Sequence, residues 1–132
     1  MNTRGERNNN PGNVRHLAGV TWHGQRDEQT DDAFVQFVDP VFGIRAIVRV
    51  LRSYEREGLH TIQSAIDRWA PPNENNSQAY VLAVCEDCDI APSDVVDFTD
   101  IMPKLVKAII KHENGECIYS DAQINEGITL AA

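Results

Sequence analysis

Apolar side chains recur every three or four residues after Pro40, and this spacing is the strongest constraint on the fold. They are Ile44, Ile47, Val48, Leu51 and Tyr54, at positions i, i+3, i+4, i+7 and i+10. An α-helix places such positions on one face, so the segment is expected to be a helix with one buried side. Asp39 and Pro40 provide its start, because aspartate caps a helix N-terminus and proline fits the first turn. Gly58 is expected to end it.

Four further segments show helical patterns between strong breaks. Their expected bounds are Thr61–Trp69, Ser77 to about Val84, about Asp100 to Glu113, and Asp121–Leu130. Pro71-Pro72 stops the first of them, because proline cannot donate a backbone hydrogen bond and restricts the residue before it. Asn114-Gly115 stops the third, and Ser120 with Gln123 forms a capping box before the last. The sequence therefore predicts five helices.

The stretch before Asp39 has no helical pattern. Asn8 to Asn13 (Asn-Asn-Asn-Pro-Gly-Asn) has the composition of tight turns, since asparagine and glycine tolerate left-handed backbone. Phe34–Val38 is a short β-type run. Together with the helices, these segments predict a mainly α (α+β) fold with a small irregular β region near the N-terminus. A length of 132 residues is typical of one domain, so residues 1–132 are expected to form a single domain.

The charge of the chain limits its partners. It has 12 Lys and Arg against 20 Asp and Glu, a net charge of −8. Phosphate neutralisation needs clustered cations, so no nucleic-acid partner is expected, although residues 1–26 hold four arginines against a single glutamate. The sequence has no run of about 18 apolar residues, so no membrane span is predicted. The N-terminus lacks the apolar core of a signal peptide.

Two cysteines have the spacing found in redox and zinc sites. Cys85 and Cys88 form a C-x-x-C motif, and only Cys117 and His112 are available as further zinc ligands. Glu86-Asp87, between the two thiols, opposes thiolate formation. Unreactive thiols in a reducing compartment are therefore the favoured interpretation, and a thiol-redox or zinc module is the lesser one. No metal and no cofactor are predicted.

Three polar segments lie next to the predicted elements, at residues 4–15, 68–76 and 111–115. Loops on a rigid scaffold are the usual location of binding sites. Asparagine amides can hydrogen-bond to the hydroxyl and acetamido groups of sugars, and the indole of Trp69 offers a flat apolar face for stacking. The alternative interpretation is structural, with the asparagines in turns and Trp69 in the core.

Glu113 stands out among the acidic residues because it ends an apolar helix beside a tight Asn-Gly turn. A rigid element would then hold its carboxyl group at the edge of the fold. Partly apolar surroundings near the negative end of a helix favour a protonated carboxyl group. A protonated carboxyl group is what the cleavage of a glycosidic bond requires of its general acid. The alternative is an exposed glutamate in a last helical turn.

Four groups of residues resemble tailed-phage and prophage virion structural proteins, over nearly the whole chain. These groups are Arg4-Gly5 with Asn8–Arg15, Phe34, Phe37 and Pro40 with Gly43–Ala46, Arg68–Pro72 with Glu74, Asn75, Ala79 and Tyr80, and His112–Gly115 with Tyr119. More remotely, that family resembles the lysozyme superfamily of peptidoglycan hydrolases, especially the glucosaminidases and lytic transglycosylases. The resemblance implies a lysozyme-like domain, made in the host bacterial cytoplasm and incorporated in the virion.

The order of the motifs departs from the pattern of those enzymes. In them the Asn-rich segment follows a helix that ends in the catalytic glutamate, whereas here the segment begins almost at residue 1. The helix that ends at Glu113 would take that place in a circularly permuted arrangement. The resemblance thus implies Glu113 as the general acid, with Glu6 as the runner-up, which no predicted helix holds.

The resemblance also implies a sugar-binding cleft and an activity. The implied substrate-binding residues are Asn10, Asn13, Arg15, Trp69 and Tyr80. The expected function is that of a phage virion-associated peptidoglycan glycosidase, a lysozyme or lytic transglycosylase that cleaves the β-1,4 glycan backbone. Its partners would be glycan strands and other virion proteins. The alternative is a non-enzymatic virion structural or cell-wall-binding protein that keeps a lysozyme-like fold.

Overall fold

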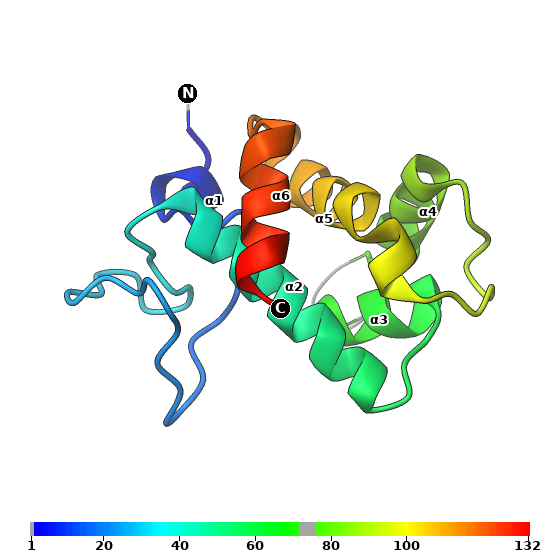
Figure 1. The fold of residues 1–132 in the computed structure, drawn as a ribbon, viewed down its shortest axis with the longest axis horizontal. Helices are drawn as coiled ribbons and strands as arrows, with labels where there is room; N and C mark the ends of the chain where they lie inside the picture. The colour runs from blue at the N-terminus through cyan, green and yellow to red at the C-terminus, as the bar shows by residue number, and fades with distance from the viewer. Residues whose placement is uncertain (1, 72–75) are drawn as a thin grey trace.

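The computed structural model of the protein describes residues 2–71 and 76–132, and it is mainly helical (Figure 1). Six helices lie in these ranges: α1 (Arg4–Arg7), α2 (Pro40–Arg56), α3 (Ile62–Trp69), α4 (Ser77–Cys88), α5 (Phe98–Asn114) and α6 (Asp121–Leu130). Strand pairing in the described residues is limited to two isolated bridges, Arg15 with Phe34 and Gln25 with Phe37. The mainly α prediction is confirmed, and the β-type run at residues 34–38 takes part only in these isolated bridges.

The bounds of the helices follow from their caps. The carboxylate of Asp39 accepts a hydrogen bond from the Val41 N–H group, so α2 begins where the sequence predicts. In α5 the cap is Asp97, whose carboxylate accepts from the Thr99 N–H group, and the helix begins two residues before the predicted Asp100. The helix α4 continues beyond Val84 to Cys88, and its C-cap is Asp89, which has left-handed backbone.

The sixth helix, α1, is a single turn that the sequence analysis missed. The Thr3 side chain accepts from the Glu6 N–H group, and the Glu6 carboxylate accepts from the Thr3 N–H group at 2.8 Å. This reciprocal capping box holds the turn closed. The expectation that no helix holds Glu6 is therefore wrong.

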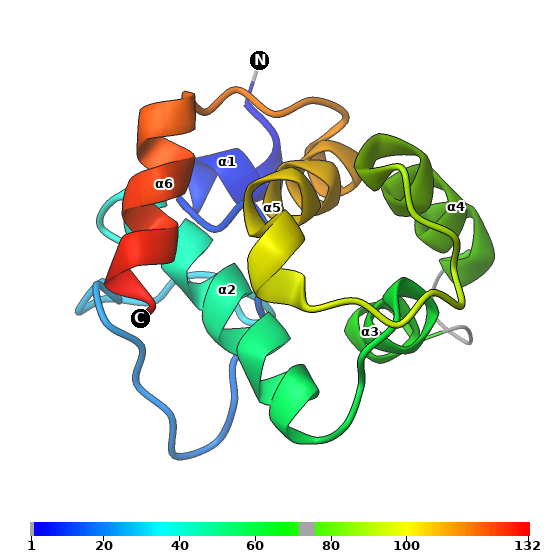
Figure 2. The ribbon, with the colours of Figure 1, turned by 45° about the vertical axis from the view of Figure 1, so that its right-hand side comes forward.

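The five longer helices share one apolar core. The helix α2 packs against α6 and α5, while α4 packs against α5 and α3. Figure 2 shows α1 beside α5, in agreement with the contacts between these two helices. The largest buried side chains of the core include Ile47, Leu51, Leu105 and Ile109, each fully excluded from solvent. In the described part of the chain, no helix is both long enough and apolar enough to cross a membrane.

The N-terminal segment is held together by hydrogen bonds from asparagine side chains and packs on α2 through apolar contacts. Asn9 has left-handed backbone (φ +52°), and its amide donates to the carbonyl of Phe37. The buried amide of Asn10 donates to the carbonyls of Val14 and Val35, while its oxygen accepts from the Val14 N–H group. Val14, Val35 and Phe37 form a second apolar cluster with Ala46 of α2. The Asn-rich stretch therefore builds the fold of this segment.

The carboxylate of Asp31 accepts several hydrogen bonds within the same segment. Its carboxylate accepts two hydrogen bonds from the Arg4 guanidinium, both at 2.7 Å. It also accepts from the side chain of Asn8 and from the N–H groups of Ala33 and Phe34, each at 2.9 Å. The Arg4 guanidinium, with these further donors, holds the pKa of the Asp31 carboxyl well below its usual range.

Asp31 is expected to make the stability of the protein depend on pH in the acid range. Because the folded pKa lies below the unfolded value of about 3.9, the carboxylate stabilises the fold above that pH and loses its contribution as the pH falls further. Urea unfolding of Asp31→Asn should therefore show a larger loss of unfolding free energy at pH 7 than at pH 3. The matched control is Asp32→Asn, at the exposed neighbouring residue. A loss for Asp31→Asn that does not depend on pH would contradict the prediction.

Candidate functional site

A cleft of about 350 Å³ lies where the N-terminal segment meets the ends of α3 and α5. Its described lining residues are Gly12, Asn13, Arg15, Phe34, Arg68, Trp69, Ala70, Pro71 and Glu113. Four of the residues singled out in the sequence therefore meet in one place: Asn13, Arg15, Trp69 and Glu113. They come from three segments that are remote from one another in the chain.

Glu113 lies in the last turn of α5, where its half-buried carboxyl group borders the cleft. The amide of Asn13 donates a hydrogen bond to Glu113 Oε1 at 2.9 Å, across a sequence separation of 100 residues. Asn13 itself has left-handed backbone (φ +51°), a conformation that asparagine tolerates better than most residues. This contact fixes one oxygen of the carboxyl group.

Asn114 fastens the end of α5 to the N-terminal segment. Its amide donates to the carbonyls of Pro11 (2.7 Å) and Ile110 (2.9 Å), and its oxygen accepts from the Thr3 hydroxyl at 2.6 Å. The side chain of Asn114 is thus tied to Thr3, before α1, and to Pro11, after it. These bonds hold the Glu113 backbone in place relative to the opposite wall of the cleft.

Aromatic rings and guanidinium groups form the rest of the wall. Trp69 is partly buried at the end of α3, with the ring of Tyr54 edge-on at a centroid distance of 6.5 Å. The Arg15 guanidinium lies over the ring of Phe34, 5.1 Å from its centroid. Arg68 is paired with Glu57 at 2.7 Å. The lining therefore offers flat apolar faces, hydrogen-bond donors and positive charge beside one carboxyl group.

Tyr80, expected to contact the substrate, lies behind Glu113 instead. It is 2% exposed and its ring stacks on His112, with 3.8 Å between the centroids. Its hydroxyl group is buried without a hydrogen bond of ordinary geometry to the described residues. Burial, together with the nearby Glu113 carboxylate, raises the pKa of Tyr80 well above its ordinary value. A protonated, buried hydroxyl group therefore backs the carboxyl group.

Two other predicted site residues also lie outside the cleft lining. Asn10 is fully buried, and its amide is used on the backbone of Val14 and Val35, so it does not reach the cleft. Glu6, the runner-up acid, is 8% exposed and its carboxylate caps α1. The geometry therefore favours Glu113 over Glu6 as the carboxyl group available to a ligand.

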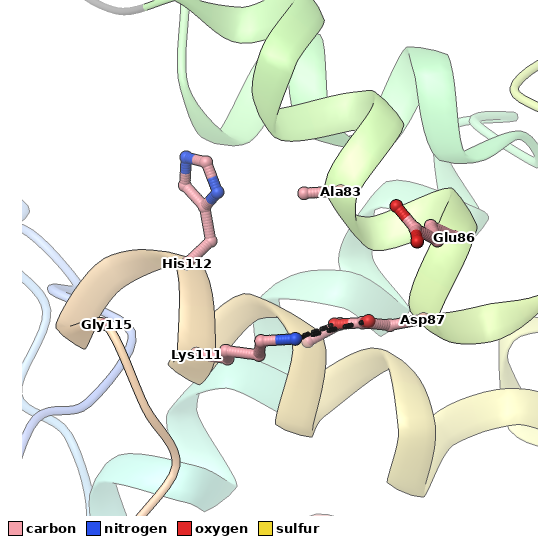
Figure 3. Close-up of a pocket in the computed structure, with 7 residues that line it drawn as sticks. Ala83, Glu86, Asp87, Lys111, His112 and Gly115 are labelled. Atoms are coloured by element: carbon pink, nitrogen blue, oxygen red, sulfur yellow. Dashed lines mark hydrogen bonds and ion pairs between the residues drawn. The ribbon is translucent and has the colours of Figure 1, made fainter.

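A second hollow of about 270 Å³ adjoins the cleft and shares four of its residues. The shared residues are Asn13, Arg15, Arg68 and Trp69. A separate hollow lies between α4 and α5, where Figure 3 shows His112 pointing away from Lys111. Lys111 is paired there with Asp87 at 3.4 Å, so one of the two carboxylates that line this third hollow has a cationic partner.

The thiols of the C-x-x-C motif are buried in α4, each 5% exposed. Burial raises the pKa of Cys85, and burial followed by the nearby Asp87 raises that of Cys88 to about 11. Raised values leave little thiolate near neutral pH, which agrees with the interpretation of unreactive thiols. Among the described residues, no group of three or more His, Cys, Asp or Glu side chains is arranged to hold a metal ion.

Sequence reasoning missed Phe34 as part of the site. Phe34 belongs to the β-type run of residues 34–38, and its bridge with Arg15 brings it to the cleft. Arg68 could be found from its place beside Trp69 at the end of a helix. Most of the polar loop predicted at residues 73–76 lies outside the described residues, although Asn76 is described and caps α4 in place of the predicted Ser77.

No family model matches the chain. It is 36% identical over 127 residues to Protein P5 of Pseudoalteromonas phage PM2, an alignment that covers 94% of the chain and 79% of the phage protein. The chain belongs to the Protein P5 family. Membership of the Protein P5 family confirms the predicted association with a bacteriophage. The name Protein P5 states no activity, so the resemblance to lysozymes stays a prediction.

Proposed function

We propose that the protein is a phage-associated peptidoglycan glycosidase that cleaves β-1,4 bonds of the glycan backbone. The observation that carries the proposal is the place of Glu113, at the end of a buried helix and in a cleft lined by aromatic rings and amide groups. Aromatic faces stack on sugar rings, and amides hydrogen-bond to their hydroxyl and acetamido groups. For a protein of a phage family, we take as the substrate class the cell-wall glycan that a phage must cross.

In the proposed reaction, Glu113 donates its proton to the glycosidic oxygen, which joins C1 of N-acetylmuramic acid to C4 of N-acetylglucosamine. The C1–O bond breaks, its electrons pass to the leaving oxygen, and positive charge develops at C1. Asn13 holds Glu113 Oε1, so Oε2 is the oxygen that carries the proton. The buried Tyr80 hydroxyl group lies behind the carboxyl group.

The substrate itself completes the proposed reaction. Glu113 is the only carboxyl group among the cleft residues that the structure describes. The muramic acid 6-hydroxyl attacks C1 and gives its proton to Glu113, which restores the acid and leaves a 1,6-anhydro sugar. In the hydrolytic variant, the acetamido oxygen attacks C1; water then attacks C1, breaks its bond to the acetamido oxygen and gives its proton to Glu113. Both routes need only one protein carboxyl group.

The proposal extends to the fold and the location of the protein. A lysozyme-like arrangement in circularly permuted order would explain why α5 supplies the acid from the end of the chain opposite the Asn-rich segment. The bonds of Asn114 to Thr3 and Pro11 support this arrangement, since they seat α5 directly behind that segment. We place the protein in the phage virion, where it would open the wall locally during infection.

The second candidate function is a non-enzymatic virion protein that binds cell-wall glycan. One observation favours it: the described cleft residues include a single carboxyl group. A binding protein can retain such a group after losing its activity. Under this alternative, the aromatic wall and Asn13 bind glycan strands, and Glu113 only accepts hydrogen bonds from sugar hydroxyl groups.

Purified peptidoglycan separates the two functions. The protein is incubated with insoluble sacculi, and the soluble fragments are identified by mass spectrometry. The glycosidase predicts release of disaccharide peptides, with 1,6-anhydro ends for a transglycosylase and reducing ends for a hydrolase. Co-sedimentation with sacculi without release of fragments would establish the binding function instead. The absence of both fragment release and co-sedimentation would overturn both candidate functions.

A further inference from the structure

The second hollow, next to the cleft, has a lining unlike that of the cleft itself. Apolar side chains from the N-terminal segment and α2 form most of it: Val14, Leu17, Trp22, Val50 and Tyr54. Its boundary with the cleft is made by Asn13, Arg15, Arg68 and Trp69. The two hollows are therefore adjacent compartments, and one ligand can extend from one into the other.

The two arginines of this boundary differ in their partners. Arg68 is paired with Glu57 at 2.7 Å, which balances its charge. Within residues 2–71 and 76–132, Arg15 makes no ion pair, and its guanidinium lies over the ring of Phe34. The chain has a net charge of −8, so an arginine left without a carboxylate beside an apolar hollow is an available anion-binding group.

Trp22 contributes its ring to the wall of the second hollow. Its indole Nε1 is buried and donates no hydrogen bond to the described residues, so the wall offers its ring surface and not this donor. The hollow therefore combines apolar surface with one guanidinium at its edge that makes no ion pair with the described residues.

We propose that the second hollow binds the acidic substituent of N-acetylmuramic acid, the lactyl group with its peptide stem. This inference rests on the proposed glycosidase or glycan-binding function of the cleft. The methyl groups of the lactyl and alanine units fill the apolar surface, and a stem carboxylate pairs with Arg15. The protein would thus select muramic acid glycans over neutral polymers of N-acetylglucosamine.

The test compares two soluble tetrasaccharides by calorimetry, with Glu113→Gln as the background so that neither is cleaved. One alternates N-acetylglucosamine with N-acetylmuramic acid that carries peptide stems, and the other is chitotetraose. The parent is expected to bind the stem-bearing ligand about tenfold more tightly or better. Adding Arg15→Gln should lower the affinity for the stem-bearing ligand much more than the affinity for chitotetraose, and so remove most of that preference. Arg15→Lys should keep part of it.

Arg56→Gln is the matched control, since it removes an exposed arginine of α2 that lines neither hollow. It should leave both affinities unchanged. Equal affinities of the parent for the two ligands would overturn the inference and leave the proposed function standing. An equal loss of both affinities in Arg15→Gln would also overturn it. Absence of binding to either ligand would refute the proposed function together with the inference.

Discussion

Glutamine in place of Glu113 is expected to lower the rate of glycan release from sacculi by about 10²-fold to 10⁴-fold, the usual contribution of a general acid. Glutamine has nearly the same shape as glutamate but has no proton to donate to the leaving oxygen. Its side-chain oxygen can still accept the hydrogen bond from Asn13, so the fold should be preserved. The measurement is the initial rate of release of soluble fragments, with circular dichroism to verify the helix content.

Glu116→Gln is the matched control for this variant. Glu116 is exposed, lies three residues further along the chain, and lines neither the cleft nor the second hollow. It should release glycan at the rate of the unaltered protein. If Glu113→Gln retained full activity, the assignment of the general acid would be wrong, and Glu6 would become the carboxyl group to test.

Alanine in place of Gly43 is expected to destabilise the protein by about 2 kcal/mol or more. Gly43 lies in α2 where the N-terminal segment crosses it. An added Cβ would overlap the carbonyl oxygen of Asn9 and would lie 2.9 Å from Cδ of Pro11. The obstructing atoms belong to the backbone and to a proline ring, so they cannot move aside by a change of rotamer. The free energy of urea unfolding measures the effect.

Helix propensity alone gives the opposite sign for this substitution. In a helix interior without close neighbours, alanine is more stable than glycine by about 1 kcal/mol. Gly58→Ala serves as the comparison, because Gly58 has positive φ (+89°) and no atom within 4 Å of an added Cβ, so its cost comes from backbone strain alone. Greater stability of Gly43→Ala than of the unaltered protein would show that the segment does not pack against α2 as described.

The helices could be predicted because their signals are local. The capping box of Ser120 with Gln123 and the Asp39-Pro40 start place α6 and α2 at their observed first residues. The start of α5 was misplaced because Asp97 and Asp100 are both suitable caps, and only the fold selects Asp97. The end of α4 was misplaced because Asp89 adopts a left-handed conformation that the sequence does not signal strongly.

The candidate site was only partly predictable. The meeting of Asn13 with Glu113 was expected from a resemblance, because no local pattern links residues so far apart in the chain. Asn10 was expected to bind substrate, whereas its amide binds backbone carbonyl groups. A sequence does not distinguish these two uses of an asparagine side chain. Tyr80 was misassigned for a similar reason: its spacing on α4 fits both a buried and an exposed aromatic residue.

The hydrogen bond between Asn13 and Glu113 has a consequence for how the protein folds. Closing a loop of 100 residues costs chain entropy that local helix contacts do not, and folding slows as such non-local contacts come to dominate. During synthesis, the N-terminal segment leaves the ribosome long before α5, so its bonds to Glu113 and Asn114 cannot form until the chain is nearly complete. We therefore expect the helical core to assemble first and the cleft to form last. In the cell that makes the protein, glycan could thus be bound only by completed chains.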